Sequence, residues 1–311
     1  MAAVTAAMVK ELREMTGAGM MDFKKALAET AGDMDKAVEF LREKGLAGAA
    51  KKAGRIAAEG IVATLVSADG KTATIVEVNA ETDFVAKNEK FQSYVADVAE
   101  QALASSSDSI EAFMAETWLK DSTLTVEQAL SSQISVIGEN MKIRRFTKVE
   151  EANGIIASYI HAGGKIGVLV DVQTDVVNDS IKEMAKNVAM QAAALKPLYT
   201  SRDEVDADYI AKETEILTQA AKNEKPDAND KIISGMVAGR INKELKEVCL
   251  LDQVYVKAED GKQSVAQYVA DVAKANGAKL TIKKFIRFET GEGLEKKEED
   301  FAAEVAKQMG M

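Results

Sequence analysis

The chain has 311 residues, enough for about two or three ordinary domains, and its net charge of −10 argues against a nucleic-acid-binding surface along its whole length. It contains one histidine, His161, and one cysteine, Cys249, so it has few side chains for a catalytic triad or a zinc site. The start of the chain lacks the pattern of a signal peptide, and no apolar run reaches the roughly 20 residues of a membrane span. These features favour a binding protein over an enzyme, in a reducing compartment.

The first 54 residues are predicted to form a small three-helix bundle. The expected helices, each begun by a polar residue and closed near a glycine, run from Thr5 to Gly17, from Asp22 to Thr30, and from Asp33 or Asp35 to Gly45. A bundle this small buries little apolar surface, so we expect it to lean on a partner or on the rest of the chain. The small and basic segment Ala47–Arg55 is predicted to be a linker.

The middle of the chain contains an internal repeat. Gly60–Val78 aligns without a gap onto Gly154–Val172, an offset of 94 residues (154 − 60), with eight identities in 19 positions. Each copy is predicted to be a strand, a turn that tolerates positive φ, and a second strand. A helix is expected after each hairpin, over Asn88–Ala104 and Asn178–Leu195. The repeat therefore predicts two similar subdomains, each with an antiparallel sheet covered on one face by helix.

The segments around the repeat have their own signals. Ser105–Thr125 is rich in serine and acidic residues and is expected to be a surface excursion. Thr125 and Gln128 match a capping box that begins a helix, which Gly138 ends.

The only two prolines, Pro197 and Pro226, bracket a helical stretch from about Ser201 to Lys222, and a second helix is expected over Asp227–Val248. The two helices predict an antiparallel hairpin. The apolar residues expected to meet across it are Val205, Tyr209, Ile216 and Ala220 on the first helix and Ile233, Val237, Ile241 and Leu245 on the second. The remaining expected elements are a strand over Leu280–Glu289 and a short helix over Glu299–Met309.

Four segments of the chain resemble one known family. They are Leu12–Asp22, Thr82–Asn88, Ile137–Arg145 and Phe285–Gly293, and they stand in the family's order over nearly the whole chain. On these motifs the sequence is similar to the elongation factor Ts family, whose members are guanine-nucleotide exchange factors for elongation factor Tu. No Gly-x-x-x-x-Gly-Lys-[Ser/Thr] phosphate loop and no dinucleotide fingerprint compete with this interpretation.

The fold class that the patterns and the resemblance imply is α+β. We expect an N-terminal three-helix ubiquitin-associated-like bundle, two repeated α+β core subdomains with antiparallel sheets, an inserted antiparallel helical hairpin and a short C-terminal helix. The expected domain bounds are 1–54 for the bundle, 55–145 for the first core subdomain, 146–196 with 249–290 for the second, 197–248 for the hairpin and 291–311 for the C-terminal module.

The resemblance implies that the loop Thr82–Val85 inserts beside the nucleotide site of elongation factor Tu and displaces the elements that hold magnesium. A phenylalanine at a loop tip, such as Phe84, can wedge between helices, and its burial is worth about 1.5–3 kcal/mol. We interpret Thr174–Val177 in the second copy as an echo of this loop, with Val176 in place of Phe84. The alternative is that Asp83 caps a helix and that Phe84 is an ordinary core residue.

The resemblance also implies partner contacts at five further residues, with alternatives that stay open. Met20 and Met21 would form a partner-binding edge of the bundle, although methionine pairs are more often core, and we expect one exposed and one buried. Ile137 and Gly138 match a family contact near the partner's phosphate-binding loop, but Ile137 also fits a helix-terminal core position. His161 matches a family histidine thought to approach the same loop, or it is an incidental turn residue.

An exchange factor needs no covalent chemistry; it must bind its partner better without nucleotide than with it. We therefore expect no enzyme activity, no cofactor and no metal site of its own. The expected partner is elongation factor Tu, GDP-bound and nucleotide-free, in the cytoplasm, with no direct nucleic acid and no membrane. Three points stay open: whether the protein forms a dimer or a 2:2 complex, whether the helical hairpin contacts the partner or another copy, and whether Lys51 or Lys52 nears tRNA. The alternative function is a general scaffold or chaperone-like adaptor without exchange activity.

Overall fold

The computed structural model describes residues 5, 8–10, 12 and 20–295, and the fold is α+β as predicted. Two three-stranded antiparallel sheets form its centre, with strand orders β1-β2-β3 and β4-β5-β6. The strands are β1 (Glu59–Val66), β2 (Thr72–Ala80), β3 (Met141–Glu150), β4 (Gly154–His161), β5 (Ile166–Thr174) and β6 (Leu280–Glu289). The helix expected over Glu299–Met309, and most of the one expected from Thr5 to Gly17, lie outside the described residues.

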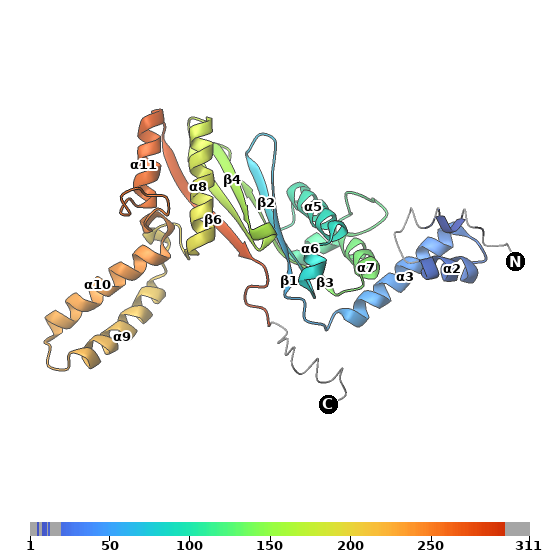
Figure 1. The fold of residues 1–311 in the computed structure, drawn as a ribbon, viewed down its shortest axis with the longest axis horizontal. Helices are drawn as coiled ribbons and strands as arrows, with labels where there is room; N and C mark the ends of the chain where they lie inside the picture. The colour runs from blue at the N-terminus through green and yellow to red at the C-terminus, as the bar shows by residue number, and fades with distance from the viewer. Residues whose placement is uncertain (1–4, 6–7, 11, 13–19, 296–311) are drawn as a thin grey trace.

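Helices cover the outer face of each sheet, so the body is built in four layers, helix on sheet on sheet on helix (Figure 1). The first sheet carries α5 (Glu89–Ala104), α6 (Ile110–Ala115) and α7 (Val126–Ile137), and the second carries α8 (Asp179–Leu195) and α11 (Val265–Asn276). A short helix, α4 (Asp83–Ala86), follows β2 directly. Outside the body lie α2 (Met20–Glu29) and α3 (Met34–Lys52) at one end and an arm of α9 (Ala207–Glu224) and α10 (Asp230–Val248) at the other.

The inner faces of the two sheets pack directly on one another. Successive residues of a strand point to opposite faces, and β2 follows this rule. Ala73 and Ile75 face the second sheet, while Val76 and Val78 face the helices. The inter-sheet core consists of Val62, Ala73, Ile75, Val149, Ile156, Leu169 and Phe288. Because this core has contributions from both repeats, neither sheet could bury its inner face alone.

The hairpins predicted from the repeat are confirmed, and one repeated glycine has a clear steric reason. β1 pairs with β2, and β4 with β5, both antiparallel and in register with an offset of 94. A Cβ on Gly60 would lie 2.2 Å from the carbonyl oxygen of Val78, and one on Gly154 would lie 1.9 Å from that of Val172. Side chains are therefore excluded at the start of β1 and β4 because the neighbouring strand comes too close.

The repeat extends well beyond the hairpins. Gln101 of α5 and Gln191 of α8 are both buried, and their side chains make the same contacts. Each donates to a backbone carbonyl and accepts from the N–H two residues later, at 2.8 to 3.2 Å, the pairs being Thr117 with Leu119 and Val254 with Val256. Each clamped segment then leads to a helix begun by a capping box, Thr125 with Gln128 or Ser264 with Gln267.

Both copies also end alike. Gly138 and Gly277 close their helices in the left-handed conformation, with φ of 90° and 59°, and a third strand follows, β3 or β6. The α9–α10 arm is inserted in the second copy between α8 and the clamped segment, where the first copy has α6. The two subdomains are thus versions of one unit, hairpin, helix, clamped segment, helix and strand.

The prediction that Ser105–Thr125 is a surface excursion is wrong. The segment contains α6, and Phe113 and Trp118 are buried in the core of the first subdomain. The polar residues that suggested a loop are used internally, since Ser105 and Ser107 both donate to the Glu116 carboxylate, at 2.5 and 2.7 Å. These bonds lower the pKa of Glu116 against the opposing effect of its burial.

The third helix was predicted to start at Asp33 or Asp35 and to end at Gly45. Asp33 is its N-cap, but the end is wrong, because α3 continues to Lys52 and takes up most of the expected linker. Gly45 is buried, and a Cβ there would lie 3.4 Å from Ser135 Oγ on α7. Gly45 therefore lies within the contact between α3 and α7 and does not end the helix.

The antiparallel helical hairpin is confirmed, but the residues expected at its seam are only partly right. Ile233 and Val237 on α10 are buried as predicted, whereas Ile216 and Ala220 on α9 are exposed. The buried stripe of α9 runs one residue later, through Leu217 and Ala221. The expected seam was counted from Val205, which lies before the start of α9. Because each residue rotates a helix by about 100°, an error of one residue moves the predicted stripe away from the buried face.

Two further differences concern the core. β3 pairs with β2 along its whole length and crosses the expected boundary at residue 145, so the first sheet extends to Glu150. α11 was not among the expected elements, although Ser264 and Gln267 form the same kind of capping box that begins α7.

Candidate partner-binding site

The motif Thr82–Val85 forms a single exposed turn of helix, α4. Thr82 is its N-cap, with the Val85 N–H donating to Thr82 Oγ1 at 3.4 Å. Phe84 is 81% exposed, while Val85 is buried against the first core. The interpretation of Phe84 as a core residue is therefore wrong, and so is the suggestion that Asp83 is the cap. A large exposed aromatic side chain on a short turn is the kind of feature that marks an interaction surface.

α4 is an insertion that the second copy lacks. From the last residue of β2, Ala80, to the N-cap of α5, Asn88, the chain advances eight residues (88 − 80). From Thr174 to Asn178 in the second copy it advances four (178 − 174). The difference equals the length of α4. The interpretation of Thr174–Val177 as an echo of the Phe84 loop is accordingly wrong: Thr174 ends a strand and bonds to the backbone of Val176, which is half-buried.

Asp83, the first residue of α4, places a partly exposed carboxylate next to Phe84. The ammonium group of Lys87 donates to Asp83 Oδ2 at 2.6 Å, and this bond lowers the pKa of the Asp83 carboxyl, with a smaller contribution from Lys165. Lys165 belongs to the β4–β5 turn and is ion-paired with Glu59 at 2.5 Å. The turn of the second hairpin and α4 of the first subdomain thus lie on the same side of the molecule.

His161 is the last residue of β4, just before that turn, and it is exposed. Its Nδ1 lies 3.0 Å from the hydroxyl oxygen of Tyr159. The turn is fixed against β1, because a Cβ on Gly164 would lie only 2.9 Å from Ile61 Cβ. The structure therefore places His161 at the surface beside a rigid turn, where it can reach a partner.

Ile137 and Gly138 lie at the end of α7, next to the base of α4. Ile137 is half-buried and packs on the core of the first subdomain, as expected for a core residue at the end of a helix, while Gly138 is exposed. The following residue, Glu139, accepts hydrogen bonds from the backbone and the hydroxyl of Thr82. The two predicted contact regions, Thr82–Val85 and Ile137–Gly138, are thereby joined. Glu139 was not among the predicted site residues.

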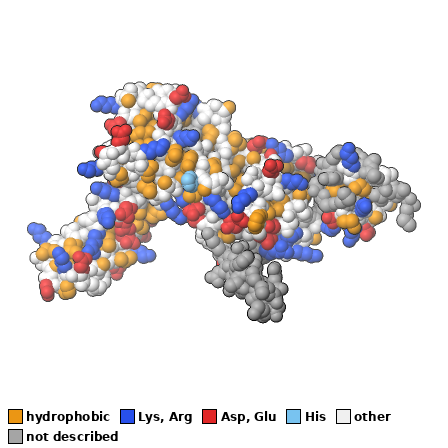
Figure 2. All heavy atoms as spheres, viewed as in Figure 1, with side chains coloured by type: hydrophobic (Ala, Val, Ile, Leu, Met, Phe, Trp, Pro, Cys, Tyr) orange, Lys and Arg blue, Asp and Glu red, His pale blue; other side chains and the backbone are white. Residues whose placement is uncertain are grey.

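Met21 belongs to a different surface. It is 75% exposed on α2, and the side chain of Met20 lies outside the described residues. The bundle holds to the body through α3, which packs on α7, and Figure 1 shows it at one end of the molecule. The space-filling view in Figure 2 shows hydrophobic side chains in patches on the central body and charges of both signs mixed over it and over the arm.

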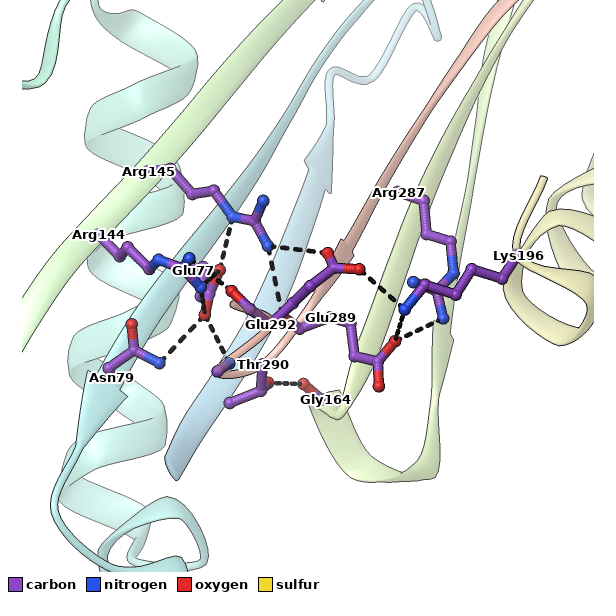
Figure 3. A network of polar contacts seen from close by, with 11 residues as sticks. Glu77, Asn79, Arg144, Arg145, Gly164, Lys196, Arg287, Glu289, Thr290 and Glu292 are labelled. Carbon is purple, nitrogen blue, oxygen red and sulfur yellow. Dashed lines mark hydrogen bonds and ion pairs between the residues drawn. The ribbon is translucent and has the colours of Figure 1, made fainter. Parts of the chain in front are cut away.

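A buried ionic network fixes the two subdomains to each other (Figure 3). The Glu77 carboxylate is fully buried and accepts from Arg144 Nη1 at 3.0 Å, from Arg145 Nε at 2.6 Å and from the Gly291 N–H at 2.8 Å. Gly291 follows β6, so Glu77 of the first copy holds the end of the second. Around it, Lys196 pairs with Glu292 at 2.9 Å. The surface formed by α4 and the β4–β5 turn is thus set on a rigid body.

The described residues contain no group of three or more His, Cys, Asp and Glu side chains placed to hold a metal ion. Cys249 is buried, and burial raises the pKa of its thiol. Among the described helices, none has the length and apolar character needed to cross a membrane.

An exposed phenylalanine on a braced turn marks a candidate partner-binding surface, and comparison with known proteins gives the family of the chain. The profile of the family described as elongation factor TS matches residues 81–292. Elongation factor Ts of Clostridioides difficile (strain 630) is 56% identical over 309 residues, 99% of this chain and 100% of that protein. Elongation factor Ts of Clostridium botulinum (strain Eklund 17B / Type B) is 52% identical over 308 residues, 99% of each. The chain belongs to the elongation factor Ts family and is a translation elongation factor.

Proposed function

We propose that the protein is a cytoplasmic guanine-nucleotide exchange factor. It binds GDP-bound elongation factor Tu, displaces the magnesium ion and releases GDP so that GTP can bind. The observation that carries the proposal is Phe84, an aromatic side chain 81% exposed on the inserted turn α4. Leaving such a side chain in water forgoes about 1.5–3 kcal/mol, which docking into the nucleotide-free partner would recover.

The proposed mechanism is differential binding. A wedge that fits only the partner conformation with disrupted phosphate and magnesium contacts weakens nucleotide binding by the same factor by which nucleotide weakens binding of the wedge. Each tenfold effect corresponds to about 1.4 kcal/mol. Gly138 and His161 supply further contacts on the same side, and Met21 supplies a separate one from the bundle. In this proposal the factor performs no covalent chemistry and carries no cofactor or metal of its own.

The test is the release of fluorescently labelled GDP from elongation factor Tu in the presence of Mg²⁺ and unlabelled GDP. We expect catalytic amounts of the protein to accelerate release at least about 10-fold, since a Phe84-sized apolar contact alone supplies about 1.5–3 kcal/mol. The acceleration should be smaller when a chelator has removed Mg²⁺, because the protein then no longer has to displace the ion. Binding to elongation factor Tu without faster release would instead support the adaptor function. Light scattering of the complex would settle whether it is 1:1 or 2:2.

A further inference from the structure

Two glutamates brace the loop that carries α4, and they do so in different ways. The Glu81 carboxylate accepts from the backbone N–H of Asn140 at 2.5 Å. The Glu139 carboxylate accepts from the Thr82 N–H at 3.0 Å and, with its other oxygen, from the Thr82 hydroxyl at 2.7 Å. The loop before α4 and the loop after α7 therefore exchange hydrogen bonds in both directions.

The second copy of the repeat contains only one of these braces. Asp175 stands where the first copy has Glu81, at the offset of 94, and it accepts from the Lys279 N–H at 2.8 Å. Lys279 in turn corresponds to Asn140, at the offset of 139 that relates α7 to α11. The Glu81 brace is thus part of the repeated fold. At the position of Glu139 the second copy has Ala278, which has no side-chain acceptor.

The brace that is absent from the second copy occurs together with the insertion that is absent from it. Thr82 Oγ1, which donates to Glu139, also accepts the Val85 N–H that begins the helical turn. A chain of hydrogen bonds therefore runs from Glu139 through Thr82 into α4. A four-residue helix cannot maintain itself, because the first turn fixes several residues for one hydrogen bond. Hydrogen bonds to a carboxylate are stronger than neutral ones and suit this purpose.

We propose that Glu139 is a positioning residue that holds α4, and with it Phe84, in the orientation that the partner requires. The proposal rests on the exchange function proposed above. Glu139 need not touch the partner: it removes the cost of ordering the turn at the moment of binding. Without the Glu139 side chain, α4 is no longer held in one orientation, and neither is Phe84.

The experiment compares Glu139→Ala with Asp175→Ala, which removes the one brace of the second copy, and with Phe84→Ala and the double variant Glu139→Ala/Phe84→Ala. Labelled GDP release from elongation factor Tu should slow about 10-fold in Glu139→Ala, the equivalent of one carboxylate-assisted bond, and not in Asp175→Ala. In the Phe84→Ala background, Glu139→Ala should have no further effect, because residues that act as a unit are not additive. Additive losses would overturn the proposal.

A second measurement separates failure of this inference from failure of the proposed function. Hydrogen exchange of the backbone amides of residues 83–88 in the free protein should rise in Glu139→Ala while exchange in α5 stays unchanged. If the wild-type protein fails to accelerate GDP release, the proposed nucleotide-exchange function fails, and hydrogen exchange still tests the role of Glu139. Unchanged hydrogen exchange in residues 83–88 of Glu139→Ala overturns the proposal. Should Glu139→Ala unfold, Thr82→Val removes the hydroxyl bond to Glu139 together with the N-cap bond from the Val85 N–H, and hydrogen exchange in residues 83–88 should rise in the same way.

Discussion

The two copies of the repeat solve one folding problem with different residues. Both bury an acidic side chain between the sheets at the same position, Glu77 in the first and Asp171 in the second, at the offset of 94. Glu77 is matched by two arginines, whereas Asp171 lies beside Glu151, which is itself paired with Lys283 at 2.9 Å. The features that the copies share, such as the glutamine clamps and capping boxes, build the fold. One feature that they do not share, α4, carries the exposed Phe84 of the candidate site.

The largest expected effect breaks the network around Glu77. Glu77→Gln removes the charge that both arginines face, and removing one partner of a buried ion pair costs about 3–5 kcal/mol. We expect the free energy of unfolding in urea to fall by about 3 kcal/mol at pH 7. Asp171→Asn, the matched change, should show no such loss. Equal losses in the two variants would mean that the two buried acids play the same part.

Phe84→Ala tests the inserted turn, and Val177→Ala, which is 52% exposed in the shorter loop of the second copy, is its control. Loss of the Phe84 contact should slow GDP release from elongation factor Tu by about 10- to 100-fold. The melting temperature should barely move, because the side chain is exposed. Val177→Ala should change neither quantity. A Phe84→Ala protein that melts many degrees lower but exchanges normally per folded molecule would contradict the wedge.

The pH dependence of stability tests the buried Asp171. Burial, with the neighbouring Glu151 second, raises the pKa of Asp171 to about 6, while Lys283 and Lys284 oppose the shift. A carboxyl whose pKa is higher in the folded than in the unfolded state contributes stability below its ordinary pKa of 3.8 and loses it as pH rises through about 6. Asp171→Asn removes this loss and should be more stable than wild type by about 1–3 kcal/mol at pH 7, but not near pH 4. Urea unfolding at the two pH values measures the difference, and parallel profiles would refute it.

The smallest effect concerns the two capping boxes. Thr125→Ala and Ser264→Ala each remove an N-cap and should each cost about 1 kcal/mol of unfolding free energy. The two losses should add to within about 0.5 kcal/mol, because the helices lie in different subdomains. Thermal unfolding of the two single variants and the double variant gives the comparison. A loss confined to one helix would show that the copies do not use their caps alike.

Local chemistry could be predicted from the sequence wherever a few neighbouring residues decide it. The hairpin turns and the Thr125 capping box were predicted correctly on this basis, and Asp33 was one of the two residues proposed to begin its helix. Gly45 was misjudged because its role depends on α7, some 90 residues further along the chain. Ser105–Thr125 was misjudged because its serines are satisfied by a glutamate within the same segment, which composition does not reveal.

The candidate site was chosen from the family motif, but its geometry could not be derived from the sequence. Matching Thr82 with Thr174 assumes an offset of 92 residues between the copies. The strands of the two copies are in fact related by an offset of 94, and the caps of α5 and α8 by an offset of 90. The four-residue insertion becomes visible only once the ends of the strands and the caps of the helices are known. Glu139 lies within a quoted motif, yet its partner Thr82 is 57 residues away, and no local pattern connects them.

The arm formed by α9 and α10 begins and ends at the same point. The backbone N–H groups of Leu198 and Tyr199 both donate to the Val248 carbonyl, at 2.8 and 3.1 Å, and the Leu250 N–H donates back to Tyr199 at 2.8 Å. A segment whose ends are tied together in this way can be lengthened, shortened or exchanged without pulling on its host, as in a domain insertion. The arm is therefore free to change in length without disturbing the body, and it is a natural place to graft a foreign helical hairpin.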